Sequence, residues 1–218
     1  MQTRKKVYGI ALALTCGLAV TLKAQNLFIG NLEYNTIGEY STSGATVNAS
    51  LISGLAAPWG IAISGNNLFV ANFEGGSRGT IGEYTTSGMT VNASLISAGL
   101  NGPSGIAISG NDLFVANEGY ASTPGGVGEY TTSGATVNAS LIPGGFLYGI
   151  AISGNDMFIL NDSNGTVGEY TTSGAPLYVS ISGLGPVGGI AVSSVPEPTA
   201  GALATLGAAA LWLWRRRK

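Results

Sequence analysis

The segment GIAISGNNLFVANFEGGSRGTIGEYTTSGMTVNASLI, residues 60–96, recurs along the chain with nearly constant spacing. Related copies begin at Asn26, Gly105 and Gly149. The triplet Gly-Glu-Tyr marks every copy, and the distances between triplets give a period of about 40–46 residues; the triplets start at Gly38, Gly82, Gly128 and Gly168. A repeat of this length predicts the blades of a β-propeller, each a four-stranded sheet.

Each copy contains four short strand candidates separated by turn residues. In residues 60–96 they are 61–64, 68–72, 80–86 and 90–96. Leu68-Phe69-Val70-Ala71 is apolar on both faces, as expected for a sheet covered on both sides by neighbouring sheets. The first copy lacks the GIAIS strand, and the segment GGIAVSS, residues 188–194, ends the repeat region.

The sequence therefore predicts an all-β protein, a β-propeller of about four blades whose first blade is closed by that C-terminal strand. Closure removes the exposed sheet edges that promote aggregation. The alternatives are an open β-solenoid, or a partial propeller that closes by dimerisation.

Two stretches resemble the repeats of NHL-type propellers. They are Pro58-Trp-Gly-Ile-Ala-Ile-Ser-Gly-Asn-Asn-Leu-Phe-Val-Ala-Asn and, in the next copy, Pro103-Ser-Gly-Ile-Ala-Ile. The resemblance covers about 170 residues. NHL-type propellers usually have more blades than four. They serve as protein-binding scaffolds and, in some relatives, as hydrolases or lyases, so the resemblance implies an architecture rather than an activity.

The residue inventory limits the chemistry of the repeat region. Between Gln25 and Ser194 the only cation is Arg78, against ten carboxylates, and this region contains no His, Cys or Lys. The negative charge disfavours nucleic acid as a partner. Without His, Cys or Lys, a Ser-His-Asp triad, a Cys-His pair, a Schiff base and a His-ligated zinc are all excluded. We predict that the domain is not an enzyme and has no cofactor; the alternative is a secreted metal-dependent hydrolase or lyase that uses carboxylates.

Some side chains recur in every copy, and others interrupt the pattern. The repeated carboxylates predict structural hydrogen bonds or, as the alternative, a ring that binds Ca²⁺; they are Glu39, Glu83, Glu129 and Glu169. The repeated amides predict side chains that cap turns, with a role in Ca²⁺ binding as the alternative. They are Asn31, Asn72, Asn117 and Asn161. Asn-Ala-Ser matches the glycosylation pattern at Asn48, Asn92 and Asn138, although repetition of a strand is the favoured explanation. The residues that interrupt the pattern form a candidate face for a sugar or a peptide: Trp59, Phe73, Arg78, Tyr120, Phe146 and Tyr148.

The N-terminal residues 1–24 have the pattern of a secretory signal peptide. Three basic residues precede an apolar run and a small-residue cleavage site at Ala24. The alternatives are an uncleaved anchor helix and lipidation at Cys16, the only cysteine. Cleavage after Ala24 would leave a mature chain without a thiol.

The C-terminal residues 195–218 combine three elements. Val195-Pro196-Glu197-Pro198 precedes the 16 mostly apolar residues 199–214, and the chain ends with Arg215, Arg216, Arg217 and Lys218. The apolar run would span roughly 24 Å as a helix, slightly short for a membrane core of about 30 Å. The positive-inside rule predicts a cytoplasmic C-terminus.

This order resembles the PEP-CTERM sorting signal of Gram-negative bacteria. The resemblance implies recognition of the Pro-Glu-Pro motif by an exosortase, a membrane-embedded protease or transpeptidase. It also implies an association with exopolysaccharide and biofilm. We predict three segments: a signal peptide (1–24), a propeller domain (25–194) and a sorting segment (195–218). The predicted protein is exported to the periplasm, cell surface or extracellular matrix, is anchored transiently in the inner membrane, and binds exopolysaccharide or surface proteins. The alternative is a permanently tail-anchored adhesin.

Overall fold

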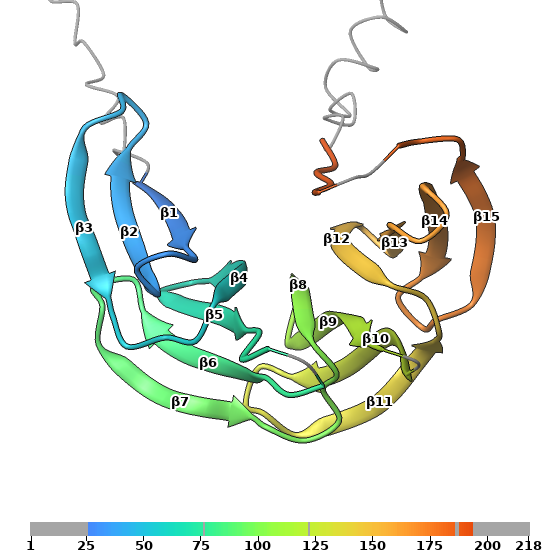
Figure 1. Cartoon of the computed structure of the whole chain (residues 1–218), viewed down its shortest axis with the longest axis horizontal. Coiled ribbons are helices and arrows are strands. Elements are labelled where there is room, and N and C mark those ends of the chain that lie inside the picture. Colours follow the sequence, from blue (N-terminus) through green and yellow to red (C-terminus); the bar gives the residue numbers. More distant parts are fainter. Residues whose placement is uncertain (1–25, 76, 122, 186–187, 194–218) are drawn as a thin grey trace, which may run out of the picture.

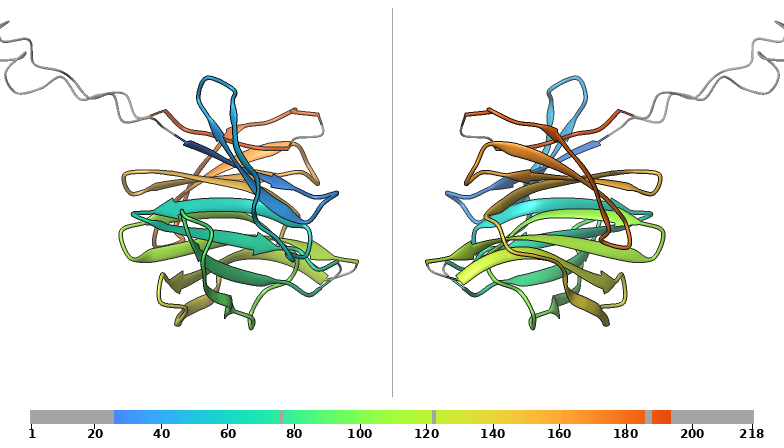
Figure 2. Two further views of the ribbon diagram at one scale, coloured as in Figure 1. Left: turned by 90° about the vertical axis from the view of Figure 1, so that its left-hand side faces the viewer. Right: turned by 90° about the vertical axis from the view of Figure 1, so that its right-hand side faces the viewer.

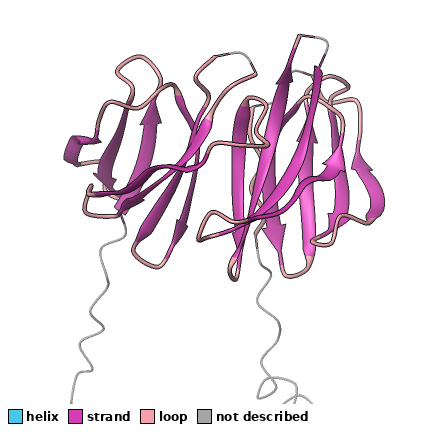
Figure 3. Ribbon diagram, turned by 90° about the horizontal axis from the view of Figure 1, so that it is seen from below, coloured by secondary structure: helices cyan, strands magenta, loops and turns pink. Residues whose placement is uncertain are grey.

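The computed structural model describes residues 26–193 except 76, 122 and 186–187. In this part of the chain Figure 3 shows strands and loops and no helix. None of the described residues forms a helix capable of crossing a membrane. The predicted signal peptide and the predicted sorting segment, with its transmembrane helix, lie outside the described residues.

The strands form four antiparallel sheets in chain order. The first sheet consists of β1 (Asn26–Asn31), β2 (Thr36–Ser41) and β3 (Thr46–Ile52). The second consists of β4 (Pro58–Ser64), β5 (Asn67–Asn72), β6 (Thr80–Thr85) and β7 (Thr90–Ile96). The third consists of β8 (Pro103–Ser109), β9 (Asp112–Tyr120), β10 (Thr123–Thr131) and β11 (Thr136–Pro143). The fourth consists of β12 (Leu147–Ser153), β13 (Asp156–Asn161), β14 (Thr166–Thr171) and β15 (Pro176–Ile181).

The four sheets are arranged around a centre like the blades of a propeller (Figure 1). The first strands β1, β4, β8 and β12 line the centre, and the last strands β3, β7, β11 and β15 lie outermost. The side views show the sheets stacked face to face (Figure 2). The predicted all-β propeller architecture is therefore confirmed.

The hydrophobic core lies between successive sheets rather than within one. Leu68 and Val70 of β5 pack against the first sheet, and Phe69 packs against the third. All three side chains are at most 1% exposed. A third cluster joins the third and fourth sheets. The strand pattern that is apolar on both faces thus arises because each middle sheet is covered on both sides.

The Gly-Glu-Tyr triplet has a packing reason. A Cβ added to Gly82 would lie 2.6 Å from the Tyr84 ring, so the ring occupies the space above the glycine. The same approach, at 2.7 and 2.8 Å, occurs at Gly38, Gly128 and Gly168. Tyr84 is 4% exposed and packs in the core between the first and second sheets. The triplet recurs because only glycine leaves room for the ring.

The predicted closure of the ring is not formed. The first sheet has three strands, and residues 188–193 form no strand. Ile190 instead lies beside Gly149 of β12, the first strand of the fourth sheet. Figure 1 shows an open arc, with a gap between the first and fourth sheets. The prediction was wrong on this point because strand count alone does not set the angle between successive sheets.

A candidate binding face

The candidate binding face lies at one end of the sheets, where the first strand of each sheet begins and the second strand ends. At this end the two strands are paired, Pro58 with Asn72 and Pro103 with Asn117. The residue that follows each paired residue therefore lies on this face, which gives two such positions per repeat. The first position is the residue before the Gly-Ile-Ala triplet: Trp59, Ser104 and Tyr148. The second is the residue after the repeated asparagine: Phe73, Glu118 and Asp162.

Backbone hydrogen bonds hold the second position in the same place in each sheet. The N–H of Phe73 donates to the carbonyl of Ala57 at 3.1 Å. The N–H of Glu118 donates to Gly102 at 2.8 Å, and that of Asp162 donates to Phe146 at 3.0 Å. The repeat therefore supplies a rigid backbone on which the side chains at this end differ from sheet to sheet.

Three aromatic rings meet on this face. The rings of Trp59 and Phe73 have centroids 5.7 Å apart at 49°, and those of Trp59 and Tyr148 are 6.0 Å apart at 71°. Trp59 remains 41% exposed, whereas Phe73 and Tyr148 are half-buried. The contacts span the second and fourth sheets, because the third sheet carries only the small residue Ser104 between them.

A carboxylate borders the aromatic cluster. The Tyr148 hydroxyl donates a hydrogen bond of 2.7 Å to Oε1 of Glu118. This bond, together with burial and the negative charges of Glu118 and Asp162, raises the pKa of Tyr148 to about 12. Tyr148 is therefore a neutral donor at physiological pH, and its bond orients the Glu118 carboxylate at the ring that Trp59 contacts. We call Trp59, Phe73, Tyr148 and Glu118 the aromatic face.

Ser104 fixes the sheets beneath this face. Its side chain is 1% exposed, and its hydroxyl lies 2.7 Å from the carbonyl oxygen of Leu147 and 3.1 Å from that of Ala116. One of these contacts joins the third sheet to the fourth. The small buried hydroxyl thus links the two sheets.

Of the six residues predicted for the ligand face, three come together as the aromatic face. Tyr120 is 55% exposed at the end of β9, and Phe146 contributes its carbonyl to Asp162. Arg78 is exposed and lines a separate cleft with Glu74 and Leu100. The prediction missed Glu118 and Ser104, although aligning the repeats marks both positions as variable.

The repeated polar residues have local structural roles. Glu83 accepts a bond of 2.7 Å from the Asn67 amide, and Glu39 accepts one from Asn26. In the third sheet Asp112 takes the place of that asparagine; burial, together with the Asp112 charge, raises the pKa of Glu129. Within the described residues no three His, Cys, Asp or Glu side chains are grouped to hold a metal ion. The carboxylates at 39, 83, 129 and 169 are not brought together as a Ca²⁺ ring.

Among the repeated asparagines, Asn31 and Asn161 cap turns, as the first interpretation predicts, whereas the Asn72 amide donates to the Thr80 hydroxyl oxygen at 3.4 Å. The Asn31 side chain accepts from the N–H groups of Glu33 and Tyr34, each at 3.0 Å. Asn117 accepts from the N–H of Asn101 at 2.9 Å. The Asn-Ala-Ser asparagines are exposed, and each accepts from the serine N–H two residues later.

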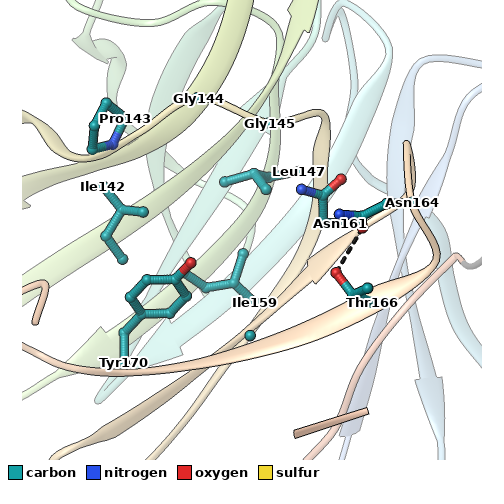
Figure 4. A pocket seen from close by; sticks show the side chains of 11 residues that line it. Ile142, Pro143, Gly144, Gly145, Leu147, Ile159, Asn161, Asn164, Thr166 and Tyr170 are labelled. Carbon is teal, nitrogen blue, oxygen red and sulfur yellow. Dashed lines mark hydrogen bonds between the residues drawn. The ribbon is translucent and has the colours of Figure 1, made fainter. Parts of the chain in front are cut away.

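A cleft of about 280 Å³ lies between the third and fourth sheets, and no residue of the aromatic face lines it. Ile142, Ile159 and Tyr170 line one part of it, and Asn161, Asn164 and Thr166 line another (Figure 4). The Thr166 hydroxyl bonds Asn164 at 2.6 Å, and the Asn161 oxygen is used by Ser163. The lining of the cleft carries no charged side chain. Its asparagine side chains form hydrogen bonds within the local turns.

Residues 194–218 match the family model of the PEP-CTERM protein-sorting motif. The motif indicates an exported protein that is sorted to the cell envelope, and it implies processing by an exosortase, a membrane protein. The predicted resemblance of the C-terminal segment to the PEP-CTERM sorting signal is confirmed. Comparison with curated proteins gives no match.

Solved structures similar to this chain are propeller-like. A chain in the crystal structure of a nidogen/laminin complex aligns with 76% of this chain at 14% identity and a TM-score of 0.62. A functionally unknown protein from Desulfotomaculum acetoxidans aligns with 75% at 22% identity and 0.54. Virginiamycin B lyase from Staphylococcus aureus aligns with 78% at 20% identity and 0.53. The alignments cover 63%, 56% and 57% of those chains respectively, less than two thirds of each. These similarities support the fold.

Proposed function

We propose that this chain is an exported, non-catalytic propeller that binds carbohydrate at the cell surface or in the extracellular matrix. The aromatic face would be its binding site. The observation that carries the proposal is the exposed Trp59 ring in contact with Phe73 and Tyr148, together with the Glu118 carboxylate that the Tyr148 hydroxyl bonds.

The chemistry of this face matches a sugar ring. An exposed, rigid aromatic ring offers a flat apolar surface to the C–H face of a pyranose. The Glu118 carboxylate is an acceptor for sugar hydroxyl groups. Binding sites commonly combine an apolar surface with a few fixed polar groups in this way. Because the repeat region carries one cation against ten carboxylates, a neutral polysaccharide fits better than an anionic one.

Affinity electrophoresis of the full chain in gels containing a neutral glucan, or neutral exopolysaccharide from the producing organism, tests the proposal. We expect retardation by the polysaccharide, and we expect Trp59→Ala to weaken it about tenfold or more, as for loss of roughly 1.4 kcal/mol. Tyr178→Ala is the matched control, because Tyr178 is 77% exposed and lies on β15. Equal retardation of wild type and Trp59→Ala would contradict the proposal.

The same samples test the alternative of a metal-dependent hydrolase or lyase. We expect no release of reducing or unsaturated ends from the polysaccharide, with or without added Ca²⁺. Release that disappears on chelation would replace the binding function with catalysis.

A further inference from the structure

The two ends of the arc leave sheet faces uncovered that are buried everywhere else in the repeat. On β1, Leu27 is 47% exposed and Ile29 is 51% exposed. Their repeat equivalents are at most 2% exposed and are buried against the preceding sheet. They are Leu68 and Val70 in β5, Leu113 and Val115 in β9, and Met157 and Ile159 in β13. The first sheet therefore has the side chains to pack against a preceding sheet that the arc does not supply.

The other end of the arc carries the start of a further sheet. A Cβ on Gly149 would lie 3.1 Å from Cγ2 and 3.4 Å from N of Ile190. A Cβ on Gly105 would lie 3.2 Å and 3.3 Å from the same atoms of Ile150. Ile190 thus occupies, beside the fourth sheet, the place that Ile150 of β12 occupies beside the third. Residues 189–193 lie where the first strand of a next sheet would lie.

The strand present at one end is the strand missing at the other. Residues 189–193, Gly-Ile-Ala-Val-Ser, repeat the Gly-Ile-Ala-Ile-Ser of residues 60–64, whereas the first sheet begins with the equivalent of β5. In the second sheet Ile61 pairs with Val70, Ala62 with Phe69, and Ile63 with Leu68. The repeat transfers this register to three pairs: Ile190 with Ile29, Ala191 with Phe28, and Val192 with Leu27.

The separation of the two ends identifies the partner. Figure 1 shows a gap between the first and fourth sheets, so residues 189–193 do not reach β1 of their own chain. Closing the gap within one chain would require a tighter angle at all three buried sheet-to-sheet cores, and close-packed interiors resist such a change. A second copy can supply the missing strand without tightening any of them.

We propose that two copies assemble head to tail, and that residues 189–193 of each copy complete the three-stranded sheet of the other. The contact is heterologous, so each copy uses two different surfaces, and two copies close it into a ring. The exposed Leu27 and Ile29 side chains become buried, and no unpaired edge remains at β1. The proposal is independent of the ligand of the aromatic face.

Disulfide trapping tests both the register and the partner. The full chain carries Cys16→Ser, so that introduced cysteines are the only thiols. Opposed residues of antiparallel strands lie within disulfide range, about 4.5–5.5 Å between Cα atoms. A chain with Ile190→Cys is mixed with a chain with Ile29→Cys and oxidised. We expect a covalent species of twice the chain mass; Ile190→Cys with Val47→Cys is the control, because Val47 is 55% exposed on the outermost strand β3.

The doubly substituted chain, Ile29→Cys with Ile190→Cys, separates the remaining arrangements. Dimers linked by two disulfides support the proposal. A single chain that loses both free thiols has closed on itself and overturns it, and the absence of any cross-link also overturns it.

Light scattering of the full chain in detergent gives a second measurement. We expect Leu27→Lys with Ile29→Lys to reduce the mass from two chains to one. Both side chains are exposed in the single copy, so the fold should tolerate the change. Val91→Lys with Val137→Lys is the matched control, because these valines are each 54% exposed on outermost strands. An unchanged mass in the Leu27 and Ile29 variant would overturn the proposal.

Discussion

The indole of Trp59 meets the ring of Tyr148 edge-on, with centroids 6.0 Å apart, although the two residues belong to sheets separated by a third. The contact is made because Ser104 occupies the corresponding position in the intervening sheet. Its side chain is small, buried, and within hydrogen-bond distance of carbonyls in two sheets. The aromatic face therefore depends on one small polar residue between two large rings.

Replacing this serine should affect stability. Ser104→Ala leaves the Leu147 and Ala116 carbonyls without the hydroxyl in a buried site, so we expect a loss of about 1–3 kcal/mol in the free energy of unfolding. Denaturant titration measures it. Ser53→Ala, at an exposed serine, should change the free energy by less than about 0.5 kcal/mol. Equal stability of the two variants would show that the Ser104 contacts contribute nothing.

The Tyr148–Glu118 pair predicts a pH dependence. The hydrogen bond to Glu118 is the largest cause of the rise in the Tyr148 pKa from 10.0 to about 12. Because the folded pKa is the higher, the contribution to stability is fully present below about pH 10 and is lost as the pH rises towards 12.

Absorbance of tyrosinate near 295 nm follows this titration. Glu118→Gln should lower the pKa of Tyr148 towards 10, while Tyr130 should still titrate late because its raised pKa comes from burial. An unchanged titration curve in the variant would mean that Glu118 does not hold the phenol proton.

The repeat made the sheets predictable. Each copy gives the same strands and turns, so residues 90–96 were predicted with the observed bounds of β7, and residues 80–86 exceeded β6 by one. β4 begins three residues earlier than predicted, at Pro58, because the residues before Gly60 pair with the end of β5. The local sequence pattern is sufficient to predict the strands because each strand packs against neighbouring sheets that have the same pattern.

Closure of the ring and the composition of the site were less predictable for the same physical reason. The angle between sheets arises from packing summed over three cores, and no single strand encodes it. Trp59, Phe73 and Tyr148 were found because they interrupt the repeat. Glu118 interrupts it too, but its role follows from a tyrosine 30 positions away in another sheet, which only the structure places within reach.

The Gly-Glu-Tyr triplet gives a further stability prediction. In Gly82→Ala the new methyl group would lie 2.6 Å from the buried Tyr84 ring, which must move into the core between the first two sheets. Overpacking of this kind costs about 1–3 kcal/mol, measurable by thermal or denaturant unfolding. Gly185→Ala is the control, since a Cβ there meets nothing within 4 Å. Similar melting curves for both variants would show that Tyr84 can relocate freely.

The sorting motif predicts the ends of the mature protein. If an exosortase recognises Pro196-Glu197-Pro198, the exported chain should end near Pro198 and begin at Gln25. Intact mass of the protein from membrane and extracellular fractions of its host measures both ends. Glu197→Ala should keep the chain in the membrane with Lys218 present, whereas Ser193→Ala, just outside the motif, should be processed normally. If the wild-type chain itself retains Lys218 in the membrane fraction, removal of the tail is refuted and the protein is a permanently anchored surface propeller.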